Sequence, residues 1–332
     1  MTKPIAVCVP VRNEAERLPR FLDAIAAQGM AGLTLCILLD GCTDASAAIV
    51  TARAPQLPFP VRVRSIAGGD ANAGRARRVA MALGQEVLGG AGTIVSTDAD
   101  SVPAPGWLAA NLAGLAHADV VAGRIVRRAW IAMPLQDRIE AYYDRLFALR
   151  RLLDPVAWEA PRTHHYTSGA SLAFRAHAYA ALGGFEGVAA AEDARIVDAA
   201  HRAGLRVRRD AAVTVETSSR REGRARGGLA DHLRALDRGA AAPTMAHPHD
   251  AAWRYRMHAA ARRAFGHESA GLSERLSRVP SEVAAIAKAA PNAEAFAMCV
   301  VPERPGGERT VSLDVAEDAL AALETDLARQ AA

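Results

Sequence analysis

The stretch Ile94–Trp107, IVSTDADSVPAPGW, joins a short apolar run to two aspartates that are one residue apart, and then to a proline-rich turn. Such a run predicts a buried β-strand, so Asp98 and Asp100 lie at the end of a strand. Residues two apart in an extended segment point to the same side, where two carboxylates repel each other. Three explanations are open: a divalent cation binds between them, one aspartate is a nucleophile, or both belong to a solvated loop.

The same kind of apolar run recurs through the first half of the chain, alternating with segments whose apolar residues repeat at helical spacing. We expect strands at Ile5–Val9, Leu33–Leu39, Val61–Ile66, Gly92–Thr97 and Asp119–Val126. Repeated strand–helix–strand units predict an α/β fold, with a mostly parallel sheet flanked by helices on both faces.

Polar clusters follow several of these strands: PVRNE, DGCTD, AGGDANAGR and TDADS. Ligands of open parallel sheets bind beyond the carboxyl ends of the strands. The coincidence of polar clusters with strand ends therefore predicts a binding site at that edge of the sheet.

The pattern changes after Arg127. A long amphipathic helix is expected at 134–154, a strand at 170–175, a helix at 191–204 and an Arg/Gly-rich loop at 217–228. From about Leu229 the chain is mainly helical, and residues 295–315 are expected to form a small hairpin around a Pro-Gly-Gly loop.

Composition narrows the class of protein. The chain has 332 residues, 51% of them hydrophobic, and a net charge of +4, which favours anionic ligands weakly. Its arginines are scattered, so nucleic acid is not an expected partner. Four cysteines without a CxxC pair, no signal peptide and no run of about 20 apolar residues predict a cytoplasmic protein without a transmembrane segment.

Two further features have both a purely structural and a functional explanation. Glu192 and Asp193 open the helix at 191–204, where acids interact favourably with the helix dipole, but a carboxylate there can also act as a general base. The arginines of the loop at 217–228 either bind phosphate oxygens or belong to a solvated loop.

DADSV also resembles the nucleophile motif of phosphatases of the haloacid dehalogenase superfamily. That motif usually follows the first strand of its domain and needs a downstream lysine. Here it follows the fourth expected strand, and Lys288 is the only lysine after Asp100.

Seven motifs occur in one order: CVPVRNEAERLPRFLDAI, LLDGCTDAS, NAGRARRVAM, STDADSVPAPGWL, SGASLAFRAHAYAALGGFEG, AEDARIVDAAHRAG and the Arg-rich loop. Over residues 4–235 the chain resembles a family-2 inverting glycosyltransferase of the GT-A fold. The resemblance implies a nucleoside-diphosphate sugar donor, a divalent metal (Mn²⁺ or Mg²⁺), and inversion at the anomeric carbon. It implies a GT-A-like catalytic domain at 1–235, divided into a nucleotide-sugar half at 1–127 and an acceptor half at 128–235, with a helical C-terminal extension at 236–332.

Site residues are carried over from the same resemblance. Asp193 would be the catalytic base, with Glu192 as its neighbour and alternate, and the Arg-rich loop would close over the diphosphate. The implied metal ligands are Asp98, Asp100 and, as a third, Glu216, with His232 and His201 as alternatives for the third position. The implied donor contacts are Pro10, Arg12, Glu14, Asp40, Arg75, Arg78, Asp98 and Arg224. The implied acceptor contacts are Gly169, Gly184 and Phe185.

The chain also departs from the family pattern. Leu39 stands where an acid often precedes Asp40, and the QxxRW box of processive members is absent. The absence of this box and of a transmembrane segment favours transfer of one sugar to a small-molecule or lipid-linked hydroxyl acceptor. Residues flanking the acceptor loop suggest a phosphorylated or carboxylated acceptor, or are ordinary loop residues: Arg162, His164, His165 and Arg175.

Three roles are open for the C-terminal segment: it completes the acceptor site, mediates formation of a homodimer or packs on the core. The rival functions are an Asp-nucleophile phosphatase and a non-catalytic sugar-nucleotide-binding protein.

Overall fold

The computed structural model describes residues 3–70, 72–128, 132–221, 229–238, 243–267, 270–302 and 307–331. Its described strands include β1 (Ile5–Val11), β2 (Leu33–Asp40), β3 (Val61–Ile66), β4 (Thr93–Ser96), β5 (Val102–Pro103), β6 (Val120–Arg128), β7 (Leu172–Arg175) and β8 (Val207–Ser218). These form one eight-stranded sheet in the order β3-β2-β1-β4-β7-β6-β8-β5. Only β5 and β7 run against the others, so the predicted mostly parallel α/β sheet is confirmed.

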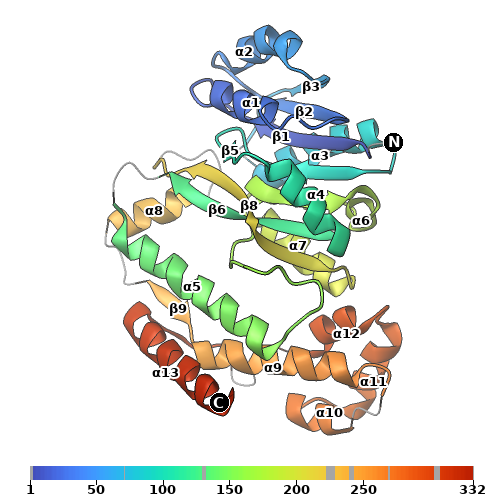
Figure 1. Cartoon of the computed structure of the whole chain (residues 1–332), viewed down its shortest axis with the longest axis vertical. Helices are drawn as coiled ribbons and strands as arrows, with labels where there is room; N and C mark the ends of the chain where they lie inside the picture. The colour runs from blue at the N-terminus through green and yellow to red at the C-terminus, as the bar shows by residue number, and fades with distance from the viewer. Residues whose placement is uncertain are drawn as a thin grey trace.

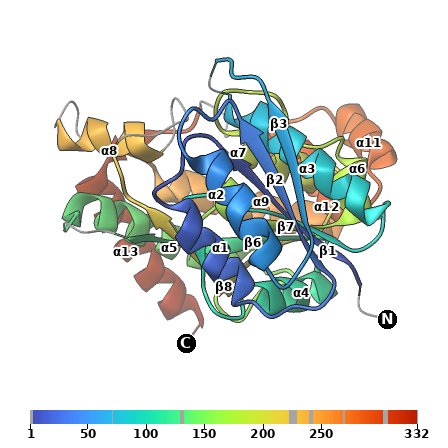
Figure 2. The same cartoon turned by 90° about the horizontal axis from the view of Figure 1, so that it is seen from above.

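Helices cover both faces of the sheet (Figure 2). On one face lie α1 (Leu18–Ala26), α2 (Ser46–Arg53) and α4 (Trp107–His117), packed in a core cluster with Val7 and Val9 of β1. On the other lie α3 (Ala73–Leu88), α6 (Ala176–Ala181) and α7 (Glu192–Arg202), packed in a cluster with Ala6 and Cys8. This alternation along β1 places its apolar residues in both layers, as expected for a buried parallel strand.

Helix α3 approaches the sheet closely because its inner face is made of small residues. Gly84 and Ala80 are buried there, and a Cβ on Gly84 would lie 2.4 Å from the Cys8 Sγ atom. The side chain of Asn72 caps the start of α3 by accepting a hydrogen bond from the Arg75 N–H, and Gly89 ends it in the left-handed conformation. The close packing brings the first turns of α3 over the ends of the central strands.

The C-terminal region packs against α5 (Pro134–Leu153), which lies between it and the sheet (Figure 1). Its described elements are α8 (Leu229–Asp237), β9 (Thr244–Ala246), α9 (Pro248–Ala264), α10 (Ala270–Leu276), α11 (Pro280–Ala289), α12 (Ala293–Val300), β10 (Thr310–Ser312) and α13 (Leu313–Ala331). Tyr142 and Leu146 of α5 share a hydrophobic cluster with Ala252 of α9 and Leu320 of α13. The predicted boundary at 235/236 stays a prediction, since this cluster joins residues from both sides of it.

The hairpin predicted at 295–315 is wrong. Residues Ala293–Val300 form α12, and β10 pairs with β9 in antiparallel fashion. Asn292 caps α12 by accepting from the Ala295 N–H, while Phe296 and Val300 are buried against α9. A run that is apolar at nearly every position has no period that separates a strand from a buried helix.

A buried ionic cluster joins α9 and α12 to α7 and to the end of α5. Glu294 of α12 accepts hydrogen bonds from Arg262 of α9 (2.7 Å) and from the Nδ1 atom of His201 of α7 (3.0 Å). Arg262 also pairs with Asp154, which follows α5. Burial alone would raise the pKa of Glu294, but the hydrogen bonds from His201 and Arg262 outweigh it and lower the pKa to about 2.

We predict that Glu294→Gln lowers the free energy of unfolding at pH 7 by about 3 kcal/mol, because Arg262 and His201 lose a buried anion. A carboxyl whose pKa is lowered by folding stabilises the fold above its unfolded pKa, and this contribution is lost as the pH falls toward about 2. Urea unfolding at pH 7 and pH 3 measures the effect, which should shrink at the lower pH. The matched control is Glu86→Gln, which removes an exposed pair with Arg64 and should change stability by less than about 0.5 kcal/mol. Equal losses in the two variants would contradict the prediction.

Candidate functional site

A cavity of about 870 Å³ opens at the carboxyl ends of β1, β2 and β4. Pro10 of β1, Asp40 of β2 and Asp98 after β4 line it on the sheet side. The opposite walls come from α5, the loop before β7, the start of α7, the end of β8 and α8. The polar clusters that the sequence places at strand ends therefore face one cavity.

The structure brings many of the predicted site residues together and places others elsewhere. Those that line the cavity are Pro10, Arg12, Glu14, Asp40, Asp98, Asp100, Gly169, Glu192 and Asp193. Those that do not are Arg75, Arg78, Gly184, Phe185 and Glu216. Arg224 lies outside the described residues.

Each residue placed elsewhere has a local reason. Arg75 and Arg78 are exposed, although they share α3 with the cavity residue Ala76. The Phe185 ring is fully buried between Phe174 and Tyr179, so it belongs to the core behind the cavity.

Two more belong to the structure around the cavity. A Cβ on Gly184 would lie 3.1 Å from the Tyr179 hydroxyl, so this turn packs against the same aromatic group. The Glu216 carboxylate pairs with Arg20 (3.1 Å) and Arg128 (3.4 Å) and does not line the cavity.

Arg77 is the central residue that sequence reasoning missed. Its guanidinium is buried and donates to Glu192 (3.0 Å), Asp98 (2.9 Å), Ser96 Oγ (2.8 Å) and the Gly169 carbonyl (3.0 Å). These partners come from the end of β4, the segment before β7 and the start of α7. Helical periodicity could have found it, because position 77 falls on the same face of α3 as these buried residues: Gly74, Ala76, Ala80, Met81 and Gly84.

Gly169 is constrained by Arg77. A Cβ at this position would lie 2.2 Å from the Arg77 Cζ atom, so any side chain would displace the guanidinium. The Gly169 N–H in turn donates to the Asp193 Oδ2 atom at 3.1 Å. One glycine thus fixes the separation between the arginine and the candidate base.

Asp193 and Glu192 occupy the first turn of α7 and have different surroundings. Glu192 is buried and paired with Arg77, whereas Asp193 is partly exposed to the cavity. Ala191, just before them, has a φ of +61°, a left-handed conformation that costs a non-glycine residue about 1 kcal/mol. Such local strain is typical of functional sites, where the surrounding structure holds it in place.

Asp98 and Asp100 lie in a turn and not in the extended segment that we expected, since the Ser101 N–H donates to the Asp98 carbonyl (3.1 Å). They have different partners: Asp98 pairs with Arg77, and Asp100 lies 3.2 Å from Arg220. Burial and repulsion from Asp98 raise the pKa of Asp100 to about 6, although Arg220 opposes the shift.

The two carboxylates fit a hard divalent cation. Among the described residues, no group of three His, Cys, Asp or Glu side chains is arranged to hold a metal. Mg²⁺ and Mn²⁺ are commonly bound by one or two carboxylates, with phosphate oxygens of the substrate completing the coordination. The donor set of Asp98 and Asp100, facing a cavity that admits a ligand, matches that pattern.

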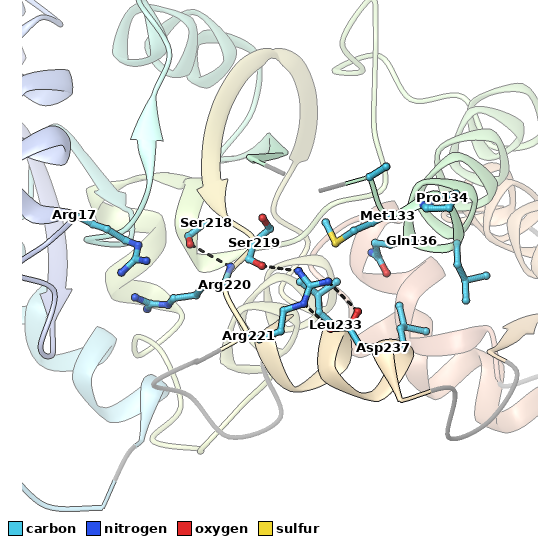
Figure 3. A pocket seen from close by; sticks show the side chains of 13 residues that line it. Arg17, Met133, Pro134, Gln136, Ser218, Ser219, Arg220, Arg221, Leu233 and Asp237 are labelled. Carbon is cyan, nitrogen blue, oxygen red and sulfur yellow. Dashed lines mark hydrogen bonds and ion pairs between the residues drawn. The ribbon is translucent and has the colours of Figure 1, made fainter. Parts of the chain in front are cut away.

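Arg220 links this cavity to a second one of about 730 Å³ (Figure 3). It bonds Glu14 through both guanidinium nitrogens, at 2.7 and 2.5 Å, and its side chain lies beside Arg17 in the view. The next residue, Arg221, turns the other way and pairs with Asp237 (2.7 Å). Of the two, Arg220 is the one whose charge reaches the aspartate pair.

We predict that Arg77→Lys lowers the free energy of unfolding by about 3 kcal/mol, because one ammonium cannot replace the fork of donors that serves Glu192, Asp98 and Gly169. Chemical denaturation measures it, with Arg75→Lys on the exposed side of the same helix as the control. The control should stay within about 0.5 kcal/mol of the parent. A loss for Arg77→Lys no larger than for the control would show that Arg77 does not hold the site together.

Comparisons with known proteins agree with this fold. Residues 6–177 match the family described as Glycosyl transferase family 2. The fold is similar to that of TarS 1–349 from S. aureus, solved in complex with UDP-GlcNAc, with a TM-score of 0.51 and 15% identity over 91% of this chain and 82% of that one. It is also similar to the mannosyltransferase PcManGT from Pyrobaculum calidifontis, solved in complex with GDP-Man and Mn²⁺, with a TM-score of 0.51 and 19% identity over 90% of this chain and 86% of that one.

No curated protein matches the chain by sequence. Within the described residues, no helix is both long enough and apolar enough to span a membrane. The family match covers more than half of the chain and includes β1 to β4, the aspartate pair and Gly169. The chain belongs to glycosyltransferase family 2.

Proposed function

We propose that this glycosyltransferase moves one hexose from a nucleoside-diphosphate sugar to a hydroxyl acceptor, by a single inverting displacement that needs a divalent cation. The observation that carries the proposal is that one cavity holds the Asp98/Asp100 pair and Asp193, with Arg77 tied to both sides. An inverting displacement needs these two functions on opposite sides of one reacting carbon.

The donor end of the cavity is the part formed by β1 and β2. Arg12 donates to Asp40 (3.3 Å) and to the Gly69 carbonyl (2.7 Å), so both side chains are held at the strand ends. A fixed carboxylate and arginine suit the hydroxyls and ring edges of a nucleoside. The donors bound by TarS and PcManGT, UDP-GlcNAc and GDP-Man, belong to this class.

The leaving diphosphate is assigned to Asp98, Asp100 and Arg220. A divalent cation, when bound there, neutralises the charge that develops on the leaving group. Arg77 holds Asp98 in place, and Arg220 adds a positive charge beside Asp100. PcManGT was solved with Mn²⁺, which supports a metal in this chain as well.

Asp193 is assigned as the general base. Its Oδ2 atom accepts from the Gly169 N–H, which orients the carboxylate without neutralising it. It can take the proton of an acceptor hydroxyl as that hydroxyl attacks. Glu192 is a poorer base, because Arg77 holds its carboxylate in a buried ion pair.

No observation favours the phosphatase alternative. Its motif would need a lysine near Asp98, whereas Lys288 lies on α11 and does not line the cavity. A non-catalytic binding protein differs from the proposal only in turnover, and the next experiment separates the two.

We predict that Asp193→Asn lowers kcat for sugar transfer by about 10²–10⁴-fold, because the proton acceptor is lost. The affinity for the nucleotide sugar should stay within about twofold, since Asp193 does not touch the donor in this assignment. Steady-state kinetics and calorimetry measure the two quantities. Asp198→Asn, an exposed position on the same helix, is the control and should behave as the parent does. Near-normal turnover of Asp193→Asn would remove Asp193 from this role.

We predict that Mn²⁺ affinity depends on pH through Asp100, whose pKa is raised to about 6. A cation binds the ionised carboxylate, so below that pH it must displace a proton and its affinity falls by up to about tenfold per pH unit. Above about pH 7 the affinity should level off. Titrations of Mn²⁺ between pH 5 and 8 measure this, and Asp100→Asn should bind weakly with less pH dependence. A constant affinity across the range would contradict the assignment of Asp100.

A further inference from the structure

His165 lies in the cavity wall and is oriented by an aspartate. It belongs to the loop between α5 and β7, and its Nδ1 atom lies 2.7 Å from the Asp144 Oδ1 atom, which also accepts the His165 backbone N–H (3.1 Å). Burial alone would raise the pKa of Asp144, but these hydrogen bonds lower it below its ordinary value, so this carboxyl is ionised. An ionised Asp144 favours a proton on Nδ1 and leaves the lone pair on Nε2.

Two tyrosines hold the imidazole ring in place. Tyr166 lies 4.0 Å from it between ring centroids, and Tyr143 lies 5.6 Å from it, both at interplanar angles near 30°. All three residues line the cavity. With Nδ1 engaged and tyrosines packed against the ring, the edge that carries Nε2 is the part that can meet a ligand. In the part of the chain that the structure describes, Nε2 has no hydrogen-bond partner.

The charges around the cavity argue against an anionic acceptor. Among the described residues, its lining carboxylates are Glu14, Asp40, Asp98, Asp100, Glu140, Glu192 and Asp193, and its lining arginines are Arg12, Arg77, Arg127 and Arg220. Each of these arginines is already paired with a carboxylate, including Arg127 with Glu140 at 2.5 Å. A divalent cation and the donor diphosphate offset each other, so the net charge of the described lining residues that an anion at the acceptor end would meet is negative.

Three of the four residues that suggested a phosphorylated or carboxylated acceptor do not supply a positive charge there. Arg162 is exposed and outside the cavity, and Arg175 donates to the carbonyls of Ala118 and Leu115. His164 is buried, and burial with a nearby arginine lowers its pKa to about 3, so it is uncharged. Of the four, only His165 faces the cavity.

Resting on the proposed function, we propose that the acceptor is a neutral polyol of the glycoside class, and that His165 Nε2 accepts a hydrogen bond from an acceptor hydroxyl other than the one that attacks. His165 is four positions before Gly169, whose N–H holds Asp193, and an extended chain of that length spans at most about 14 Å. A mono- or disaccharide can therefore reach both side chains. His165 is a specificity-determining residue, and Asp144 is its positioning residue.

The test uses the Mg²⁺-loaded full chain and the nucleotide sugar that it hydrolyses in water. Release of nucleoside diphosphate is measured without acceptor, then with methyl glycosides, and then with glucose 6-phosphate as an anionic sugar. The variants are His165→Phe, which keeps a ring between the tyrosines, His165→Gln, whose amide oxygen can accept in place of Nε2, and Asp144→Asn. The control is His177→Phe, at an exposed position on α6.

For His165→Phe we expect the KM for a methyl glycoside to rise about tenfold, with acceptor-independent hydrolysis within about twofold of the parent. The same KM should rise less in His165→Gln, should rise in Asp144→Asn, and should not change in His177→Phe. An unchanged KM in His165→Phe, or a preference for glucose 6-phosphate over neutral glycosides, would overturn the inference and leave the proposed function standing. If no nucleotide sugar is bound or cleaved by the parent, the proposed function fails and the inference fails with it.

Discussion

The guanidinium of Arg77 is the interaction on which the site depends. It is buried beneath the cavity and donates hydrogen bonds to three segments that are far apart in sequence. Its partners are Ser96 and Asp98 at the end of β4, Gly169 before β7, and Glu192 at the start of α7. A buried charge is stable only when paired and hydrogen-bonded, so each of these segments must arrive in one arrangement. The arginine therefore couples the end of β4 to the segment before β7 and to the start of α7.

The contacts of Arg77 give neighbouring carboxylates on the two sides of the cavity different surroundings. Arg77 pairs with the buried Glu192, whereas its neighbour Asp193 is partly exposed to the cavity. Arg77 also pairs with Asp98, whereas burial and repulsion from Asp98 raise the pKa of Asp100. Position 169 requires glycine, because any Cβ there would collide with the Arg77 guanidinium. Adjacent acids that look alike in sequence thus receive different environments, which is how carboxylates acquire different roles.

Much of the framework could be predicted because it depends on local periodicity. The apolar runs at Ile5 and Leu33 become β1 and β2, and the polar clusters after them reach the cavity because parallel strands end at one edge. Arg77 was missed because sequence reasoning treats an arginine as exposed, and its partners lie 19 to 115 residues away. Phe185 was assigned to the acceptor, yet its ring is in the core, since a motif does not say which way a turn packs. The contact of the His165 ring with Tyr143 depends on α5 and could not be inferred from the loop of His165 alone.

In the proposed reaction, attack assisted by Asp193 and departure of a diphosphate held at Asp98 and Asp100 occur in one displacement. The anomeric configuration of the product, read from its ¹H NMR coupling constant at early times, tests this most directly. An α-linked nucleotide sugar should give a β-linked product, and transfer should stop in excess chelator. An α-linked product, or transfer at full rate without a divalent cation, would contradict the proposed reaction.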